Sequence, residues 1–440
     1  MLVVRARRAV LPGGIAPAAV VIDDGRIVGV QEHDTDVGAD GVVDLADDEV
    51  LLPGLVDSHV HVDEPGRTDW EGFASATRAA AAGGVTTLVD MPLNSIPPTV
   101  DPAALAVKRA AAEGRVAVDV AFWGGAVPID GAVDPLRMTA LAADGVCGFK
   151  CFLTDSGVPE FPPVGAADLV LAARTCADLD VPLVVHAEDG AVLAASPAAG
   201  ADYAGFLASR PPDAETAAVR RLADVASVTG ARIHVVHVSA VEAVAEVAAA
   251  RGAGLPFTAE TCPHYLTLDA ESLTTTAGKC CPPVRSAANR EALWTALGTG
   301  RIDAVVSDHS PCPPELKAGG FDAAWGGVSS LELALRLVWT GACARGFGLA
   351  AVVGWMSTAP AALAGLGAKG AIAIGRDADL VAFAPDATGA VGAARLQHRH
   401  AVSPYDGTTL RGAVRRVWLR GEAPGAGHLI RPGATDRGAP

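Results

Sequence analysis

The chain has 440 residues, half of them apolar, and a formal net charge of −16. This length exceeds a typical domain of about 100–200 residues, so the chain holds several domains or one large α/β barrel. The acidic balance argues against nucleic acid as a partner, and no apolar run reaches the roughly 18 residues of a membrane span. Residues 1–14 lack the apolar core and cleavage site of a secretory signal, so we expect a cytoplasmic protein.

Taken in chain order, the pattern begins with short β-rich runs separated by turns over residues 1–52. Residues 17–30 place two apolar strands around Asp24-Gly25, which favours a hairpin. From Pro53 the pattern changes to a strand followed by a helix, repeated along the chain. Strands are expected over residues 51–61, 86–92, 118–124, 145–153, 182–188, 232–239, 256–262 and 303–309. Expected helices include residues 71–82, 103–113, 216–228 and 290–297.

Eight apolar strands, each followed by helical or loop sequence, predict an α/β fold with a closed (β/α)8 TIM-like barrel. The β-rich pattern returns in residues 371–383, 398–407 and 413–421. These runs are too short to stand alone, so we expect both termini to form one small β-sandwich domain. The predicted domains are therefore residues 1–52 with 371–440 for the β domain, and 53–370 for the barrel.

Ionisable side chains end five of these strands, which is where the active sites of such barrels lie. They are His59, His61, Lys150, His186, His237 and Asp308. Side chains two apart face the same side of a strand, so His59 and His61 can reach one ion. Taken alone, each histidine is more often a hydrogen-bonded core residue, and Asp308 could simply pair with an arginine. Their joint occurrence at successive strand ends favours a metal centre.

Lys150 is the unusual member of this set, because a buried ammonium is costly and repels a cation. Lysine loses its proton more readily when it is desolvated, and a neutral amine can add carbon dioxide to become a carbamate, an anionic ligand. The alternative is a lysine paired with a carboxylate of the barrel. The spacing alone leaves both interpretations open.

Longer motifs around these residues resemble the amidohydrolase superfamily, and more narrowly its cyclic-amidase branch of dihydroorotases, hydantoinases (dihydropyrimidinases) and allantoinases. The motifs are HVH within PGLVDSHVHVDEPGRTDWEGF, the lysine of GFKCFL, VVHAED, VVHVS and VVSDHSPC. Six further segments resemble the allantoinases in particular, namely DMPLNSIPPT, SGVPEFPPV, ETCPHYLTL, PPVR, DHSPCPPELK and AWGGVSSLEL. The resemblance runs from about residue 1 to 425.

The resemblance implies a centre of two divalent metal ions. His59, His61 and Asp308 would bind one ion, His186 and His237 the other, and carboxylated Lys150 would bridge them. Nitrogen and oxygen ligands suit zinc best, with manganese, cobalt or iron also possible. A hydroxide between the ions would open the hydantoin ring of allantoin to give allantoate, with Asp308 as general base and then general acid. The family resemblance also suggests a homotetramer.

Five residues are expected to contact this small-molecule substrate. They are the side chain of Asn94, the backbone near Cys281 and Ser329, Asp63 and Arg67. Asp63 stands where dihydroorotases carry an arginine that grips a substrate carboxylate and where allantoinases typically have asparagine. This counts against dihydroorotate as substrate and departs mildly from the allantoinase pattern. Asn94 could instead stabilise its own proline-rich loop, and Arg67 could form a loop pairing.

Two other functions compete with an allantoinase. A hydantoinase or dihydropyrimidinase would use the same metal chemistry, but the allantoinase-like segments weigh against it. A non-catalytic assembly protein could keep the fold and lose the metal site. Such a relative should lack ligands, whereas this chain retains all six.

Overall fold

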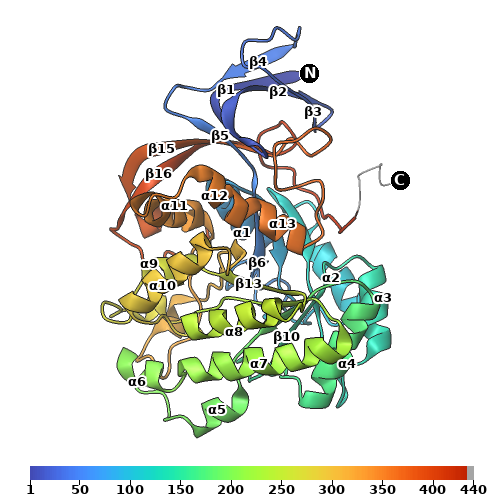
Figure 1. Cartoon of the computed structure of the whole chain (residues 1–440), viewed down its shortest axis with the longest axis vertical. Coiled ribbons are helices and arrows are strands. Elements are labelled where there is room, and N and C mark those ends of the chain that lie inside the picture. The colour runs from blue at the N-terminus through green and yellow to red at the C-terminus, as the bar shows by residue number, and fades with distance from the viewer. Residues whose placement is uncertain (434–440) are drawn as a thin grey trace.

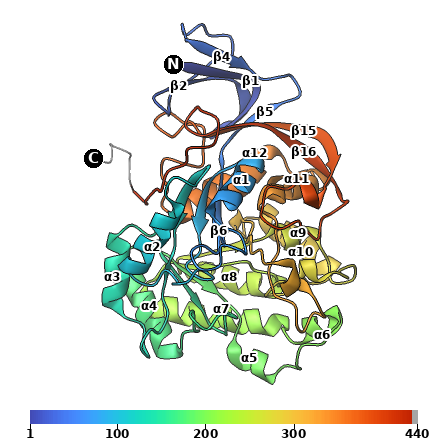
Figure 2. The same ribbon diagram turned by 180° about the vertical axis from the view of Figure 1, so that it is seen from behind.

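The computed structural model describes residues 1–433, which form one sheet from both ends of the chain and a body of parallel strands and helices (Figures 1 and 2). The terminal sheet contains β1 (Leu2–Leu11), β2 (Gly14–Asp23), β3 (Arg26–Gln31), β4 (Gly41–Asp44), β5 (Val50–Pro53), β15 (Leu380–Ala390) and β16 (Thr409–Trp418). Its order is β16-β15-β5-β1-β2-β3, with β4 also paired to β1. Strands from the two ends of the chain therefore pair, as expected. The predicted sandwich of two facing sheets stays a prediction.

The hairpin predicted at Asp24-Gly25 is confirmed. Asp23 pairs with Arg26 across the turn between β2 and β3. Asp24 and Gly25 have φ values of 46° and 73°, and positive φ at both central residues is the requirement of the favoured two-residue hairpin turn. The Asp-Gly turn signal and the two apolar runs that flank it thus predict the hairpin that forms.

The β-rich pattern after residue 370 is only partly confirmed. Within residues 371–383 the strand β15 begins only at Leu380, and residues 398–407 contain no strand. That second prediction is wrong because the segment uses its polar groups elsewhere. His400 Nε2 bonds Asp69 O at 2.7 Å, and the Asp406 carboxylate accepts the Ala393 N–H at 2.7 Å.

The body of the molecule contains two parallel sheets. One has the strands β6 (Leu55–Val60), β7 (Val85–Asp90) and β8 (Asp119–Phe122). The other has β9 (Gly124–Gly125), β10 (Phe149–Phe152), β11 (Leu183–His186), β12 (Ile233–Val235), β13 (Phe257–Thr261) and β14 (Ala304–Val305). These strands are buried along almost their whole length, which is typical of a parallel sheet covered on both faces.

The strand ladder is interrupted at two places, so the predicted closed barrel is not one continuous sheet. Trp123 separates β8 from β9, and its backbone N–H donates to Asp90 O at 2.9 Å. At the other end β14 is only two residues long, and a single parallel bridge joins Val60 to His309. The fold is therefore an α/β arrangement of parallel sheets with a further sheet from the termini.

Helices follow most of the parallel strands. They are α1 (Phe73–Ala82), α2 (Pro102–Ala112), α3 (Pro135–Ala143), α4 (Ala166–Asp178), α5 (Gly190–Ala195), α6 (Tyr203–Ala208), α7 (Pro212–Thr229), α8 (Val241–Gly252), α9 (Pro263–Thr267), α10 (Ala287–Gly298), α11 (Ala334–Ala344), α12 (Leu349–Val353) and α13 (Ala359–Leu363). Short helical turns lie at Thr276–Gly278, Pro314–Lys317, Leu331–Leu333, Gly354–Thr358 and Ala393–Arg395. Among residues 1–433 no helix combines the length and apolar character that crossing a bilayer requires.

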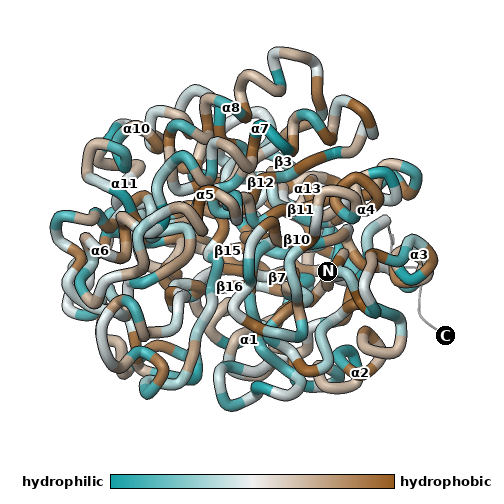
Figure 3. The backbone as a smooth tube through the Cα atoms, turned by 90° about the horizontal axis from the view of Figure 1, so that it is seen from below, coloured by the Kyte–Doolittle hydropathy of each residue, from teal (hydrophilic) through white to brown (hydrophobic). Residues whose placement is uncertain are grey.

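The helix ends follow local sequence rules. Asp101 caps α2 by accepting the Ala104 N–H, with Pro102 as the first helical residue. Ser286 caps α10 in the same way, and α7 ends at Gly230 in the left-handed conformation. Seen from the end opposite the terminal sheet, the helices surround a centre that contains β7, β10, β11 and β12 (Figure 3).

A buried cluster of charges joins the terminal segment to the parallel body. The Lys369 ammonium lies between Asp119 of β8 and the carboxylates of Asp377 and Asp379, each of the latter 2.8 Å away. Arg420 pairs with Asp119 as well. Three carboxylates thus share two cations, which offsets their desolvation.

Candidate active site

A cavity of about 300 Å³ lies at the carboxyl ends of the parallel strands. Among its lining residues are eight of the residues predicted from the sequence, namely His59, His61, Asn94, Lys150, His186, His237, Cys281 and Asp308. The six predicted ligands lie at or just after the ends of five strands, with His59 and His61 sharing β6, and they meet because parallel strands all end at the same rim.

His59, His61 and Asp308 form one group within this cavity. Nε2 of His59 and Nε2 of His61 lie 3.3 and 3.5 Å from the same oxygen, Asp308 Oδ1. His59 lies in strand β6 and His61 directly after it, and the alternation of the strand directs both side chains to the same side. Asp308 has a φ of 44°, a conformation that a non-glycine residue adopts only when its surroundings impose it.

His186 and His237 form a second group. Nδ1 of His186 lies 3.0 Å from Nε2 of His237, and the ring centroids are 4.6 Å apart. Phe152 stacks on His186 at 4.6 Å, and His237 has a φ of 38°. The two groups meet where the rings of His59 and His237 approach to 5.4 Å.

Lys150 lines the same cavity as these two groups and is completely buried. Its Nζ has no hydrogen-bond partner among residues 1–433 and lies 4.9 Å above the ring of Phe152. Burial lowers the pKa of Lys150 to about 8, although Asp308 and Glu260 oppose the effect. The amine of Lys150 is buried, has no partner in the described part of the chain and shares its cavity with four imidazoles and a carboxylate. These surroundings suit a lysine that is converted into a metal ligand.

Burial also favours the neutral form of the histidines. It lowers the pKa of His59, His186 and His237, and the positive charge of Lys150 contributes in each case. Metals bind neutral imidazole, so these rings are in the state that a metal requires. Ligand atoms of His59, His237 and Asp308 all lie within 4.8 Å of one another. The residues present therefore fit a metal centre.

Two carboxylates that contact these histidines were not predicted from the sequence. Glu260 of β13 accepts from His59 Nδ1 at 2.6 Å, and its other oxygen lies 2.9 Å from His234 Nε2. His234 also bonds Thr258 at 2.7 Å, so both of its ring nitrogens have protein partners. On the other side Glu188 lies 2.8 Å from His186 Nε2 and pairs with Arg210. Such carboxylates fix the orientation of a ligand histidine.

Two of the five predicted substrate contacts line the cavity, namely Asn94 and Cys281. Asp63, Arg67 and Ser329 are not among the described residues that line it. Arg67 pairs with Glu160 and donates to Asn94 O at 2.6 Å, which is the loop pairing considered as its alternative. Ser329 is buried.

Asp63 is buried, and neither of its carboxylate oxygens has a hydrogen-bond partner in the described chain. Burial raises the pKa of Asp63 well above its ordinary value; Asn94 and Lys108 oppose this effect, whereas the charges of Asp90 and Glu71 add to it. The uncharged acid is therefore favoured, and it resembles asparagine more closely than a carboxylate does. The departure from the allantoinase pattern at this position is smaller than the sequence suggested.

Comparison with known proteins agrees with this geometry. The Amidohydrolase family matches residues 50–423. An allantoinase from Streptomyces avermitilis is 51% identical over 424 residues, which span 96% of this chain and 94% of that protein. An allantoinase from Arabidopsis thaliana is 42% identical and spans 95% and 87%. The solved structure of an L-hydantoinase (dihydropyrimidinase) from Arthrobacter aurescens has a TM-score of 0.90 and 30% identity, covering 98% of this chain and 97% of that one. The chain therefore belongs to the amidohydrolase family and, within it, groups with the allantoinases.

Proposed function

We propose that the protein is an allantoinase, which hydrolyses the ring amide of allantoin to give allantoate. The observation that carries the proposal is the convergence of four histidines, a lysine and an aspartate in one cavity of a chain 51% identical to an allantoinase over nearly its whole length. The cavity of about 300 Å³ has room for a small heterocycle. The chemistry follows from the residues at its wall.

Two divalent ions would be held by the two groups of side chains. His59, His61 and Asp308 would hold one, and His186 and His237 the other. Carboxylated Lys150 would be shared between them, and zinc suits these nitrogen and oxygen ligands best. When bound, such ions lower the pKa of water towards about 7 and polarise a carbonyl group.

The proton transfers fall to Asp308. Its carboxylate faces the cavity and contacts both His59 and His61 through one oxygen. It would accept the proton of the attacking water and return it to the ring nitrogen as the C–N bond breaks. The carboxylate ends the cycle as it began, and the ring opens without a serine or cysteine nucleophile.

Recognition of allantoin would use groups without formal charge. Asn94 and Cys281 both line the cavity. Asn94 would offer an amide to the ureido tail, and the backbone at Cys281 would offer further polar groups. Contacts from Asp63, Arg67 and Ser329 stay predictions. Because Arg67 is already paired with Glu160, we expect it to shape the Asn94 loop.

We further propose that the two parallel sheets are parts of one (β/α)8 barrel. Support comes from the single residue between β8 and β9 and from the bridge between Val60 and His309. The domain division at residues 52 and 371, the sandwich, the cytoplasmic location and the homotetramer stay predictions. Light scattering of purified protein would check the last of these.

The alternative is a hydantoinase, and the specific observation in its favour is the similarity to the L-hydantoinase structure. The higher identity to allantoinases weighs against it. Steady-state kinetics of metal-replete protein on allantoin, hydantoin, dihydrouracil and dihydroorotate would separate the two. We expect the highest kcat/KM for allantoin. A higher value for hydantoin or dihydrouracil would replace the proposal with a hydantoinase while keeping the metal chemistry.

A further inference from the structure

The proposed ligands fall into two groups, and each group is supported by different side chains. His59 and His61 face Asp308, and His59 is backed by Glu260. His186 and His237 face each other at 3.0 Å. The second pair is supported by a larger group of polar side chains.

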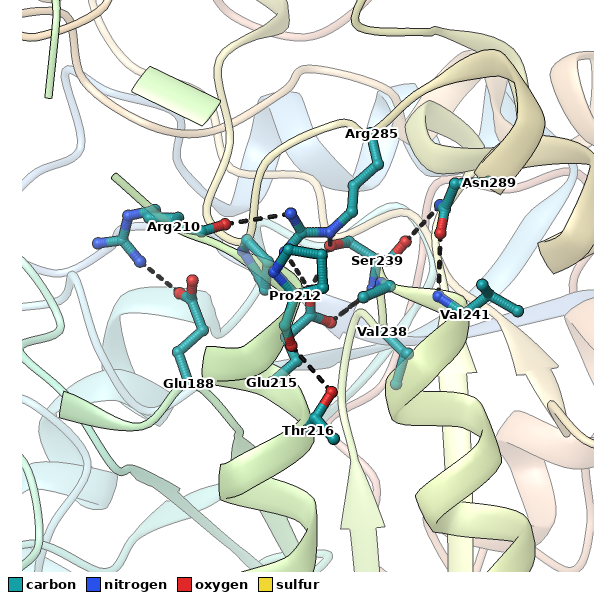
Figure 4. Close-up of polar contacts among 12 residues, drawn as sticks. Glu188, Arg210, Pro212, Glu215, Thr216, Val238, Ser239, Val241, Arg285 and Asn289 are labelled. Atoms are coloured by element: carbon teal, nitrogen blue, oxygen red, sulfur yellow. Dashed lines mark hydrogen bonds and ion pairs between the residues drawn. The ribbon is translucent and has the colours of Figure 1, made fainter. Parts of the chain in front are cut away.

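Next to the second pair lies a polar network that we call the buttress, drawn in Figure 4. It consists of Glu188, Arg210, Glu215, Ser239 and Arg285. Its residues are buried except Arg210, which is half-buried and also lines the cavity. Glu188 is fully buried, and one of its oxygens accepts from both His186 Nε2 and the Arg210 guanidinium. The orientation of the His186 ring is thus tied to Arg210.

Arg285 connects three separate segments of the chain. Its Nη1 donates to Arg210 O at 3.1 Å, its Nη2 to Glu215 Oε1 at 2.7 Å, and its Nε to Ser239 Oγ at 3.1 Å. These partners lie before α7, within α7 and after β12. A planar guanidinium is suited to such a junction, because its donors keep fixed directions.

Glu215 completes the connection to the second histidine. Its carboxylate accepts the N–H of Ser239 at 2.9 Å, the hydroxyl of Ser239 at 2.6 Å and the N–H of Ala240 at 3.2 Å. Ser239 follows His237 by two residues, in the segment where His237 holds its positive φ. Asn289 adds a bond to Ser239 O at 2.7 Å. The same cluster therefore fixes both His186 and His237.

We propose that the buttress controls the affinity of one metal position, formed by His186 and His237, separately from the position formed by His59, His61 and Asp308. The inference rests on the proposed function, because it presupposes the metal centre. Glu188, Glu215 and Arg285 act as positioning residues, since they reach the ion only through the histidines. Loss of such a partner typically weakens metal binding by about 10–100-fold.

The test is titration of metal-free protein with Zn²⁺ by calorimetry. Wild type should bind two equivalents. Glu188→Gln should keep one equivalent at wild-type affinity and bind the other about 10–100-fold more weakly. Anomalous diffraction from crystals at limiting Zn²⁺ should then show the ion next to His59 and His61, and no peak next to His186 and His237.

Three further variants complete the design. Arg285→Lys keeps a charge for Glu215 but loses bonds to the other partners, so it should weaken the same equivalent even if Glu188→Gln folds poorly. Glu260→Gln should weaken the opposite position. Arg220→Gln removes an exposed pair with Glu246 from helix α7 and should change neither equivalent.

The outcomes separate the two proposals. Wild type that binds no metal overturns the proposed function. Wild type that binds two ions, with Glu188→Gln and Arg285→Lys affecting both positions equally or neither of them, overturns the role of the buttress alone.

Discussion

Replacing Lys150 by methionine should stabilise the metal-free protein. Lys150 is completely buried, and its Nζ has no hydrogen-bond partner within residues 1–433. Burial lowers the pKa of its ammonium from 10.5 to about 8. At about 1.36 kcal/mol per pKa unit, holding the charged form in the folded state costs about 3 kcal/mol. Methionine has a similar length and carries no charge, so Lys150→Met should recover much of this free energy.

The gain should depend on pH in a defined direction. Between pH 8 and 10.5 the unfolded chain keeps a proton on Lys150 that the folded protein has released. Wild-type stability therefore rises with pH in this window. The advantage of Lys150→Met should be full below about pH 8 and should shrink as the pH approaches 10.5. The same variant should lose most bound metal and nearly all activity.

Urea unfolding of metal-free protein at pH 7 and pH 10, in buffer free of carbon dioxide, measures both effects. Lys108→Met is a matched control, because Lys108 is equally buried but its Nζ lies 2.6 Å from Asp90 Oδ2. That variant leaves a buried carboxylate unpaired and should lose about 3–5 kcal/mol. A Lys150→Met protein no more stable than wild type at pH 7, or with a gain unchanged at pH 10, would refute the reasoning.

Three other substitutions give distinct expectations. Asp308→Asn should keep substantial metal, as measured by metal analysis. Its kcat should fall by about 10²–10⁴-fold or more, since an amide cannot carry the proton. A kcat within tenfold of wild type would place proton transfer on another residue. Folded Asp63 keeps a proton that the unfolded chain releases above about pH 4, so wild type loses stability as pH rises towards the raised folded pKa. Asp63→Asn should remove that part of the slope in urea unfolding, and parallel profiles would contradict it. Lys369→Met leaves Asp379 without its ammonium partner and Asp119 with Arg420 alone, and should cost about 3–5 kcal/mol in the same assay. A cost below about 1 kcal/mol would mean that these carboxylates take up protons.

The ligand set could be predicted from the sequence because its geometry is local. His59 and His61 are placed by strand alternation, and His186 and Asp308 by their position where an apolar run ends. Parallel strands then bring these ends together whatever the details of the connecting helices. The Asp24-Gly25 hairpin was predictable for the same reason, since its signal lies within the turn.

The supporting residues could not be placed in this way. Glu260 is 201 residues from His59 in sequence, and Arg67 meets Glu160 across 93 residues. Only the folded chain brings such partners together. A signal for Glu260 did exist, because a glutamate inside the buried strand β13 needs a partner. The break in the strand ladder at Trp123 depends on local backbone geometry and has no sequence signal of this kind.

The pairing of β5 with β15 has a consequence for biosynthesis. Leu51 lies opposite Ala382, so this contact closes a loop of more than three hundred residues, and β15 leaves the ribosome long after β5. Until then β5 keeps an open edge of unpaired amide and carbonyl groups, which can pair with another nascent chain. Helices and parallel strands between them can fold earlier, whereas the terminal sheet can be completed only after β15 has been made. Protein shortened before residue 380 should therefore aggregate during expression, even though every proposed metal ligand is present in it.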